Sequence, residues 1–315
     1  MSGQAGRSCP LSYRYGAAAI ANRVEQRADT LYVIGGLYGN QPALEAITAM
    51  ARREPALVTL CFNGDFNWFD VDDHGFAALN RAVLDHDACL GNVEAELLAD
   101  DDAAGCGCAY PDSVDAGVVE RSNAIHARLK LTARRHPDIV RRLAALPMLR
   151  RYRVGALAVG VVHGDAESLA GWRFDIDALD DEGNRDWLAT AFAQARVDVF
   201  ASSHTCLPVL RRYTFDGRAA IVINNGAAGM PNFAGGRAGL ITRIGHAPSP
   251  HAAIYGDRLD GVHIDALAVG YDHARWQTEF LDNWPSGSPA HISYFERIAN
   301  GPDFSVERAR RQACR

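Results

Sequence analysis

Residues 31–50, LYVIGGLYGNQPALEAITAM, contain a strand-turn-helix unit that decides the fold class. Residues 31–34 form a short apolar run that Gly35 and Gly36 follow, a pattern typical of a buried strand ending in a turn. Asn40 and Pro42 then indicate a helix of about 12 residues, because asparagine caps helices and proline suits their first turn. This segment therefore predicts one unit of an α/β fold.

Similar units recur along the chain. The first half predicts strands over residues 56–62 and 88–90 with a helix over 74–84, and the helical signal of residues 112–146 stops at Pro147. The second half predicts a helix over residues 180–195 and strands within 151–162, 197–201, 209–213, 219–223, 240–244 and 252–255. Because both halves contain sheet, a two-sheet core flanked by helices fits better than two unrelated domains.

Composition narrows the class of protein. The chain has 315 residues, of which 48% are hydrophobic and 22% charged, so it is expected to bury a large core. No apolar run approaches the roughly 20 residues that a membrane helix needs. Residues 1–15 lack the long apolar core of a secretory signal, and an odd number of cysteines, seven, is scattered along the chain. We therefore expect a soluble protein of the reducing cytoplasm.

Charge argues against two classes of partner. The chain has 32 basic and 38 acidic residues, a net charge of −6, which disfavours broad binding of nucleic acid. All basic residues except Lys130 are arginine, which reflects either coding bias or bidentate recognition of phosphate or carboxylate. We expect no nucleic acid and no membrane as partners, and nothing in the sequence indicates an oligomeric state.

Four polar clusters follow predicted strands, where open α/β sheets place their ligand sites. They are Asn63-Gly64-Asp65, Gly91-Asn92-Val93-Glu94, His163-Gly164-Asp165 and Ser203-His204-Thr205-Cys206. A lone histidine after a strand is more often a structural hydrogen-bonding residue, so the shared position of the clusters carries the argument. A carboxylate, an amide oxygen and two imidazoles together suit Mn, Fe or Zn.

In order and spacing, these clusters resemble the motifs of the calcineurin-like metallophosphoesterase family over roughly residues 30–245. Gly64-Asp65, Gly91-Asn92, His163-Gly164 and His204-Thr205 are similar to its ligand-bearing turns, and residues 224–228 to the loop that follows them. The resemblance implies a four-layer α/β/β/α sandwich of two mixed sheets flanked by helices. It implies a metallophosphoesterase-like domain at residues 30–258 with a helical insertion at about 100–146, an N-terminal extension at 1–29 and a C-terminal extension at 259–315.

The resemblance also implies a function: hydrolysis of a small phosphomonoester or phosphodiester by metal-activated water. The alternative is a catalytically weak or inactive relative that binds a phosphorylated or nucleotide ligand as a sensor. Position 36 separates the two in principle, because the family has an aspartate there and this chain has a glycine. An enzyme must replace the missing carboxylate, whereas a sensor need not.

Several family residues are replaced here. Gly36 and Tyr38 stand where the family has an aspartate and a histidine, and Val93 and Cys206 replace two further histidines. The resemblance assigns one ion to Asp65, Asn92, His163 and His204, and a second ion to positions 36, 38, 65 and 206. Only the first set is intact, so we expect one divalent ion per chain rather than two. The resemblance implies that loss of the histidine at position 93 removes a general acid, a contribution on the order of a hundredfold or more.

Two compensations are open. Cys206 is a candidate thiolate ligand, and Cys106 and Cys108 could complete a second, zinc-binding site with it. We favour the alternative, in which Cys206 is a small half-buried residue and residues 106–108 form a surface turn. Tyr38 either directs its hydroxyl at the substrate, as an acid or hydrogen-bond donor, or packs its ring with the hydroxyl in water.

Other residues receive supporting roles. Gly39 and Asn40 form a candidate anion site at a helix N-terminus, and Arg121 is a candidate phosphate contact. Trp68, Phe69 and Trp172 either line the mouth of the site or pack in the core. Glu94, Asp70 and Asp165 are candidates for orienting the histidine ligands, although a solvated loop carboxylate is the favoured interpretation of Asp70.

Overall fold

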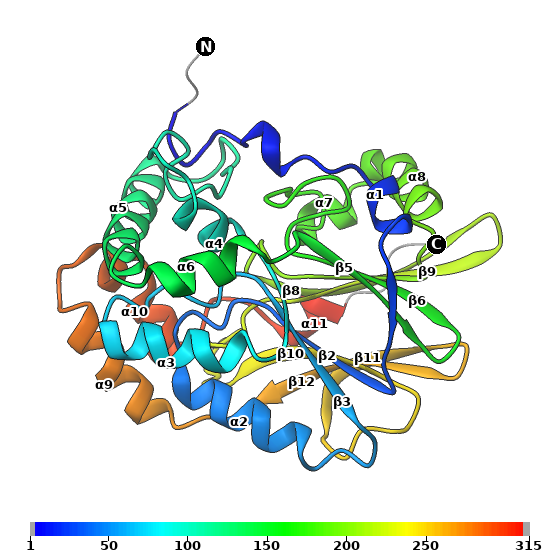
Figure 1. Cartoon of the computed structure of the whole chain (residues 1–315). Helices are drawn as coiled ribbons and strands as arrows, with labels where there is room; N and C mark the ends of the chain where they lie inside the picture. Colours follow the sequence, from blue (N-terminus) through cyan, green and yellow to red (C-terminus); the bar gives the residue numbers. More distant parts are fainter. Residues whose placement is uncertain (1–3, 311–315) are drawn as a thin grey trace.

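Two six-stranded sheets face each other in the computed structural model, which describes residues 4–310 (Figure 1). The strand order is β1-β5-β6-β7-β9-β8 in one sheet and β11-β12-β10-β2-β3-β4 in the other. Both sheets contain parallel and antiparallel pairs. The strands are β1 (Glu25–Arg27), β2 (Thr30–Ile34), β3 (Val58–Asn63), β4 (Asp87–Cys89), β5 (Leu149–Val154), β6 (Leu157–Val162), β7 (Val199–Ser202), β8 (Pro208–Phe215), β9 (Arg218–Asn225), β10 (Gly239–Gly245), β11 (Ala253–Leu259) and β12 (Val262–Val269).

Helices cover the outer face of each sheet, which confirms the predicted α/β/β/α sandwich. In Figure 1, α1, α7 and α8 lie outside the sheet that contains β5 and β6, whereas α2 and α3 lie outside the sheet that contains β2 and β3. Helices α4, α5, α6 and α10 gather at one end of the molecule. The helices are α1 (Ala18–Ala21), α2 (Gln41–Ala51), α3 (Asp73–Val83), α4 (Asn92–Leu97), α5 (Ala116–Ala133), α6 (Pro137–Ala144), α7 (Ile176–Asp180), α8 (Arg185–Ala195), α9 (His273–Asn283), α10 (Pro289–Asn300) and α11 (Val306–Arg310). Within residues 4–310, no helix is long and apolar enough to cross a membrane.

Strand β2 shows why an apolar run makes a buried strand here. Its side chains alternate: Leu31 and Val33 join the core between the sheets, and Tyr32 and Ile34 join the core beneath the helices. All four are fully buried. A strand that is covered on both faces requires apolar residues at successive positions, which is the pattern of residues 31–34.

Amide side chains tie the two sheets together beside the strand ends. Asn63 Nδ2 donates to the carbonyl oxygen of Val162 across the sheets at 2.7 Å. Asn225 Nδ2 donates to the carbonyl oxygens of Gly35 and Leu240, each at 2.9 Å. Buried hydrogen bonds of this kind hold the ends of β2, β3, β6 and β9 in a fixed relation.

One predicted helix is wrong in its extent. Residues 180–195 do not form one helix, because α7 ends at Asp180 and a separate 3-10 turn, Glu182–Asn184, precedes α8. The side chain of Asp181 accepts a hydrogen bond from the backbone N–H of Gly183 at 3.0 Å, so a new helical segment is capped at that point.

Some strands lie where extensions are predicted. Strand β12 belongs to residues 259–315 yet pairs with both β10 and β11, and β1 belongs to residues 1–29 yet pairs with β5. Helices α9 and α10 also lie within residues 259–315, and α5 and α6 lie within residues 100–146. The domain division itself stays a prediction, and residues 1–3 and 311–315 lie outside the described part of the chain.

Candidate metal centre

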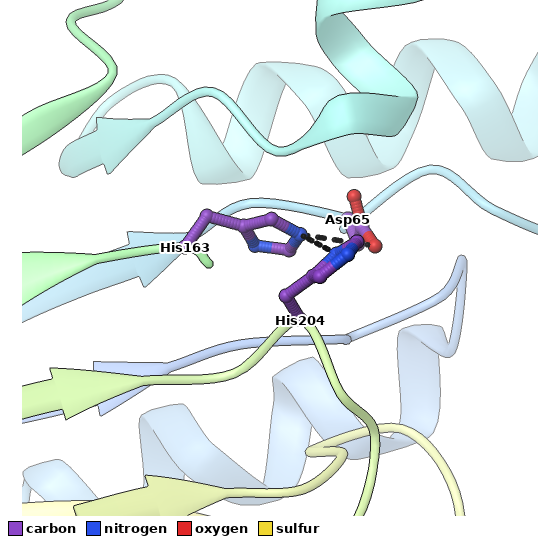
Figure 2. A group of neighbouring side chains, drawn as sticks. All are labelled: Asp65, His163 and His204. Carbon is purple, nitrogen blue, oxygen red and sulfur yellow. Dashed lines mark hydrogen bonds and ion pairs between the residues drawn. The ribbon is translucent and has the colours of Figure 1, made fainter. Parts of the chain in front are cut away.

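Asp65, His163 and His204 meet beyond the ends of β3, β6 and β7 (Figure 2). One ligand atom from each lies within 4.8 Å of the others. His163 Nε2 lies 3.3 Å from Asp65 Oδ2 and 3.3 Å from His204 Nδ1, and Asn92 Oδ1 lies 3.2 Å from the same nitrogen. All four side chains are buried. The structure thus brings together the complete set that the sequence assigns to one ion.

Backbone carbonyls orient both imidazoles. The carbonyl oxygen of Asn63 lies 2.8 Å from His163 Nδ1, and that of Cys108 lies 3.1 Å from His204 Nε2. A carbonyl oxygen only accepts hydrogen bonds, so these outer nitrogens carry the protons. In the neutral rings, the lone pairs on His163 Nε2 and His204 Nδ1 therefore face inward, toward each other and toward the carboxylate. Such a group of acceptors fits a cation.

The separations also suit a metal ion. An ion with bonds of about 2.1 Å to nitrogen and oxygen holds adjacent ligand atoms roughly 3.0 to 3.4 Å apart. The contacts of His163 Nε2, at 3.2 and 3.3 Å, fall in this range. Asn92 Nδ2 donates to the carbonyl oxygen of Cys106 at 2.8 Å, so the amide directs Oδ1 to the site. Mixed nitrogen and oxygen ligands of this type suit Mn, Fe or Zn.

The carboxylate of Asp65 is held by a close contact between two turns. Its Oδ1 accepts from the backbone N–H of Val93 at 3.1 Å, and its own backbone N–H donates to Glu94 at 2.7 Å. Gly91 is required here, because a Cβ atom at position 91 would lie 2.2 Å from Asp65 Oδ1. At position 64, a Cβ atom would lie 2.4 Å from Gly91 Cα. The Gly-Asp and Gly-Asn pairs thus allow backbone to pack on backbone.

The ionisable groups in the site shift one another's pKa values. Burial alone would lower the pKa of His163, but the Asp65 carboxylate more than offsets this effect and raises it. Burial would raise the pKa of Asp65, and His163 reverses that shift to a lower value. Burial and the neighbouring charge of His163 lower the pKa of His204 to about 3, whereas burial and Asp65 raise the pKa of Glu94 to about 7. Without a cation, a proton on His163 neutralises Asp65, so a metal ion must compete with that proton.

Two carboxylates predicted to orient the histidines contact backbone instead. Glu94 accepts from the backbone N–H groups of Asp65 and Gly91, at 2.7 and 3.1 Å. Asp165 accepts from the N–H groups of its own loop, at residues 167, 168 and 173. The favoured solvated state of Asp70 is wrong: this residue is 3% exposed, and its Oδ2 has no hydrogen-bond partner within residues 4–310. Burial raises the pKa of Asp70 well above its usual value.

Tyr38 lies between the other two positions, 36 and 206, that the resemblance assigns to a second ion. Its ring folds back over Gly36, where an added Cβ would lie 2.8 Å from Tyr38 Cζ, and its hydroxyl lies 2.9 Å from Cys206 Sγ. The residue is 4% exposed, so the alternative with the hydroxyl in water is wrong. Burial raises the pKa of Tyr38 well above its usual value, and the phenol is neutral. A neutral phenol is a poor metal ligand.

Cys106 and Cys108 match neither of the two roles that the sequence suggested for them. Cys106 and Cys108 are buried, so the predicted surface turn is wrong, and their backbone carbonyls accept from Asn92 and His204. Burial raises the pKa of the Cys108 and Cys206 thiols, which keeps both protonated. Among the described residues, the only group of ligand side chains close enough to share an ion is Asp65, His163 and His204, which includes none of these cysteines, so the predicted second zinc site does not form. Cys206 itself is half-buried, as expected.

The predicted substrate contacts do not converge on the centre. Asn40 is buried, caps α2, and donates from Nδ2 to the carbonyl oxygen of Gly229 at 2.9 Å. Gly39 lines a separate cavity. Arg121 Nε donates to Ser293 Oγ at 2.7 Å. None of the three lines the pocket beside the metal centre, so the geometry gives their predicted role no support.

A pocket of about 190 Å³ opens beside Asp65, Asn92 and His204. Its walls include Tyr38, Trp68, Tyr110, Trp172 and Tyr294. Trp68 and Trp172 therefore line the site, as one interpretation holds, whereas Phe69 packs behind Tyr38 at 5.8 Å between ring centroids.

Sequence reasoning missed Tyr110, Tyr294 and the two orienting carbonyls. Ser288 before Pro289 is a cap and first-turn signature that could have predicted α10, the helix that carries Tyr294. No residue type reveals which backbone carbonyl a histidine will contact, and nothing distinguishes Tyr110 from a core residue.

Comparison with solved structures confirms the fold. A metallophosphoesterase from Sphaerobacter thermophilus aligns over 87% of this chain and 100% of its own, at 16% identity and a TM-score of 0.54. A hypothetical protein from Pyrococcus horikoshii OT3 aligns over 87% and 99%, at 14% identity and a TM-score of 0.54. No known protein family matches the sequence, and neither does any curated protein. At such low identities, these likenesses establish the fold alone.

The first testable prediction concerns pH. Since the pKa of His163 is raised, metal binding must displace its proton, and the affinity for Zn or Mn should rise as the pH passes upward through that raised pKa. Titration calorimetry from about pH 6 to about pH 9, in buffers of different ionisation enthalpy, gives the affinity and the protons released. A His204→Ala variant reports non-specific binding. An affinity that stays constant over this range would contradict the competition.

The second concerns the contact between the two turns. Gly91→Ala should displace Asp65 and lower metal affinity at least about tenfold, with a loss of roughly 1–3 kcal/mol in the free energy of unfolding. Gly270→Ala is the matched control, because an added Cβ there has no neighbour within 4 Å. Metal content and denaturant unfolding are measured together. Normal metal content in Gly91→Ala would show that the contact does not position the carboxylate.

Proposed function

We propose that this chain, which has the metallophosphoesterase fold, is a cytoplasmic metal-dependent phosphoesterase that hydrolyses a small phosphomonoester or phosphodiester. The observation that carries the proposal is the convergence of two imidazole lone pairs, a carboxylate and an amide oxygen beside a pocket. A divalent ion held by Asp65, Asn92, His163 and His204 would supply the polarisation of a phosphoryl oxygen and the acidification of a water.

One ion per chain is part of the proposal. Tyr38 covers Gly36, and the hydroxyl of Tyr38 contacts Cys206 Sγ, so the positions for a second ion offer no carboxylate or imidazole ligand besides Asp65. A single ion lacks the two-metal clamp that stabilises both the attacking and the leaving oxygen.

Among the described residues, the pocket wall also lacks a strong proton donor. Val93 is apolar, and the nearby His126 is buried, with Nε2 3.0 Å from the carbonyl oxygen of Val93. Burial lowers the pKa of His126 to about 4, so its ring is neutral. Tyr38 retains its proton and acts as a hydrogen-bond donor to a phosphoryl or leaving oxygen rather than as an acid. We therefore propose a narrow activity that favours leaving groups which are already stable anions.

A sensor is the second proposal, and the absence of a general acid from the wall of the described pocket favours it. Such a protein would bind a phosphorylated or nucleotide ligand through the same ion without turnover. The two proposals share the metal centre and differ only in chemistry.

Metal content and activity separate them. Protein purified without chelator should contain about one ion per chain and hydrolyse an activated aryl phosphoester with added Mn, Fe or Zn. Asp65→Ala and His163→Ala should each lower turnover by more than about a hundredfold, because each removes an ion ligand. His86→Ala, at an exposed histidine, is the control. A bound ion with no turnover across a broad panel of phosphoesters favours the sensor, and about two ions per chain would overturn the single-ion proposal.

A further variant tests the role of Tyr38. Gly36→Asp alone should still bind about one ion, because its Cβ would meet the Tyr38 ring at 2.8 Å and its backbone has φ +63°. The triple variant Gly36→Asp, Tyr38→His, Cys206→His removes the ring and supplies ligands, so its metal content should rise toward about two ions per chain. Elemental analysis of the two variants gives the answer. Two ions in the single variant would show that Tyr38 does not block the position.

A further inference from the structure

The pocket beside the metal centre has aromatic walls. Tyr38 and Trp68 lie deep and are buried, whereas Tyr110, Trp172 and Tyr294 are half-buried at the rim. They come from five separate segments: the loops after β2, β3 and β6, the insertion, and helix α10.

The rim aromatics are held in fixed orientations. Trp172 Nε1 donates to the carbonyl oxygen of Cys108 at 3.0 Å, and its ring packs on that of Tyr110 at 5.9 Å between centroids. Tyr294 meets Trp68 edge to face at 6.4 Å. Rigid aromatic faces of this kind recognise a flat apolar group at little cost in entropy.

No arginine or lysine among the described residues lines this pocket. Arg297 lies behind the wall, where its guanidinium donates to the carbonyl oxygens of Cys206 and Pro231 at 2.9 and 3.0 Å. A phosphate in the pocket must therefore be balanced by the metal ion itself.

The charge balance separates two classes of phosphoester. Asp65 carries one negative charge and a divalent ion two positive charges, which leaves one positive charge in the centre. A monoanionic phosphodiester neutralises this charge, whereas a phosphomonoester dianion leaves one negative charge without a partner, a costly state in a buried site. At about 190 Å³, the pocket lies below the roughly 300–1,000 Å³ of sites for drug-sized ligands, so the bound groups must be compact.

We propose that the ligand of this pocket is a compact monoanionic phosphodiester with at least one flat aromatic group. The proposal rests on the metal centre of the proposed function and names the class of substrate. The phosphate faces the ion, and the aromatic group lies against Tyr110, Trp172 and Tyr294.

Binding at equilibrium tests both parts. Calorimetry on the metal-loaded protein at about pH 8 compares diphenyl phosphate, a monoanion with aromatic groups, with diethyl phosphate, a monoanion without them, and with phenyl phosphate, a dianion. Diphenyl phosphate should bind about tenfold or more tightly than either. Equal affinity for phenyl phosphate overturns the charge argument, equal affinity for diethyl phosphate overturns the aromatic argument, and no binding of diphenyl phosphate overturns both.

Variants locate the aromatic contact. Tyr294→Leu and Tyr110→Leu should each weaken diphenyl phosphate about three- to tenfold and leave diethyl phosphate unchanged. Phe295→Leu is the matched control on the same helix, because Phe295 packs on Phe280 and does not line the pocket. Unchanged binding of diphenyl phosphate in both tyrosine variants would overturn the assigned location.

Hydrolysis distinguishes this inference from the proposed function. 4-Nitrophenyl phenyl phosphate and 4-nitrophenyl phosphate share a leaving group and differ in charge and in the second aromatic group. If diphenyl phosphate binds in the expected order but neither compound is hydrolysed, the ligand class stands and the enzyme proposal fails. If both compounds are hydrolysed and diphenyl phosphate has no advantage in binding, the enzyme stands and this inference fails.

Discussion

The outer ring nitrogens of His163 and His204 each donate a hydrogen bond to a backbone carbonyl, and these two bonds orient the whole centre. They direct both lone pairs inward, where Asp65 supplies the negative charge. One carbonyl belongs to Asn63 at the end of β3 and the other to Cys108 in the loop between α4 and α5, so the centre depends on the two-sheet scaffold and on a loop far along the chain. This arrangement shows how an orienting partner can be set by the fold rather than by a side chain.

Gly36, Tyr38 and Cys206 form a consistent local set. The Tyr38 ring occupies the space of any side chain at position 36, and a thiol at position 206 leaves room for the hydroxyl at 2.9 Å. A larger side chain at either position would collide with the phenol unless the ring moved. Changes at these three positions should therefore be non-additive, because each residue limits what the others can be.

Local patterns predicted the two sheets flanked by helices and the polar clusters at the strand ends, whereas the family resemblance supplied the four-layer order and the assignment of the metal ligands. Strands such as residues 31–34 are marked by apolar runs, and the ligands follow such runs at strand ends. The rest depends on long-range packing. The contact of Trp68 with Tyr294 joins residues more than two hundred positions apart. The side chain of Asn40 caps its own helix, so it is not part of the anion site that the helix N-terminus suggested. Whether Arg121 meets a phosphate or Ser293 depends on how α10 packs on α5, which local pattern does not encode.

Three features of the pocket each disfavour hydrolysis of esters with poor leaving groups. In the proposed enzyme, protonated Tyr38 and neutral His126 provide no ready acid for a poor leaving group, and a single ion would stabilise the reacting phosphate. No cationic side chain among the described residues lines the pocket wall, so none stabilises the phosphate further. Hydrolysis of a phosphomonoester dianion with an alkyl leaving group depends most on an acid, a second ion and a cationic side chain. Hydrolysis of a diester with an aromatic leaving group depends on them least. We therefore propose that the same residues that weaken general phosphatase chemistry select, by charge and shape, for one class of ester.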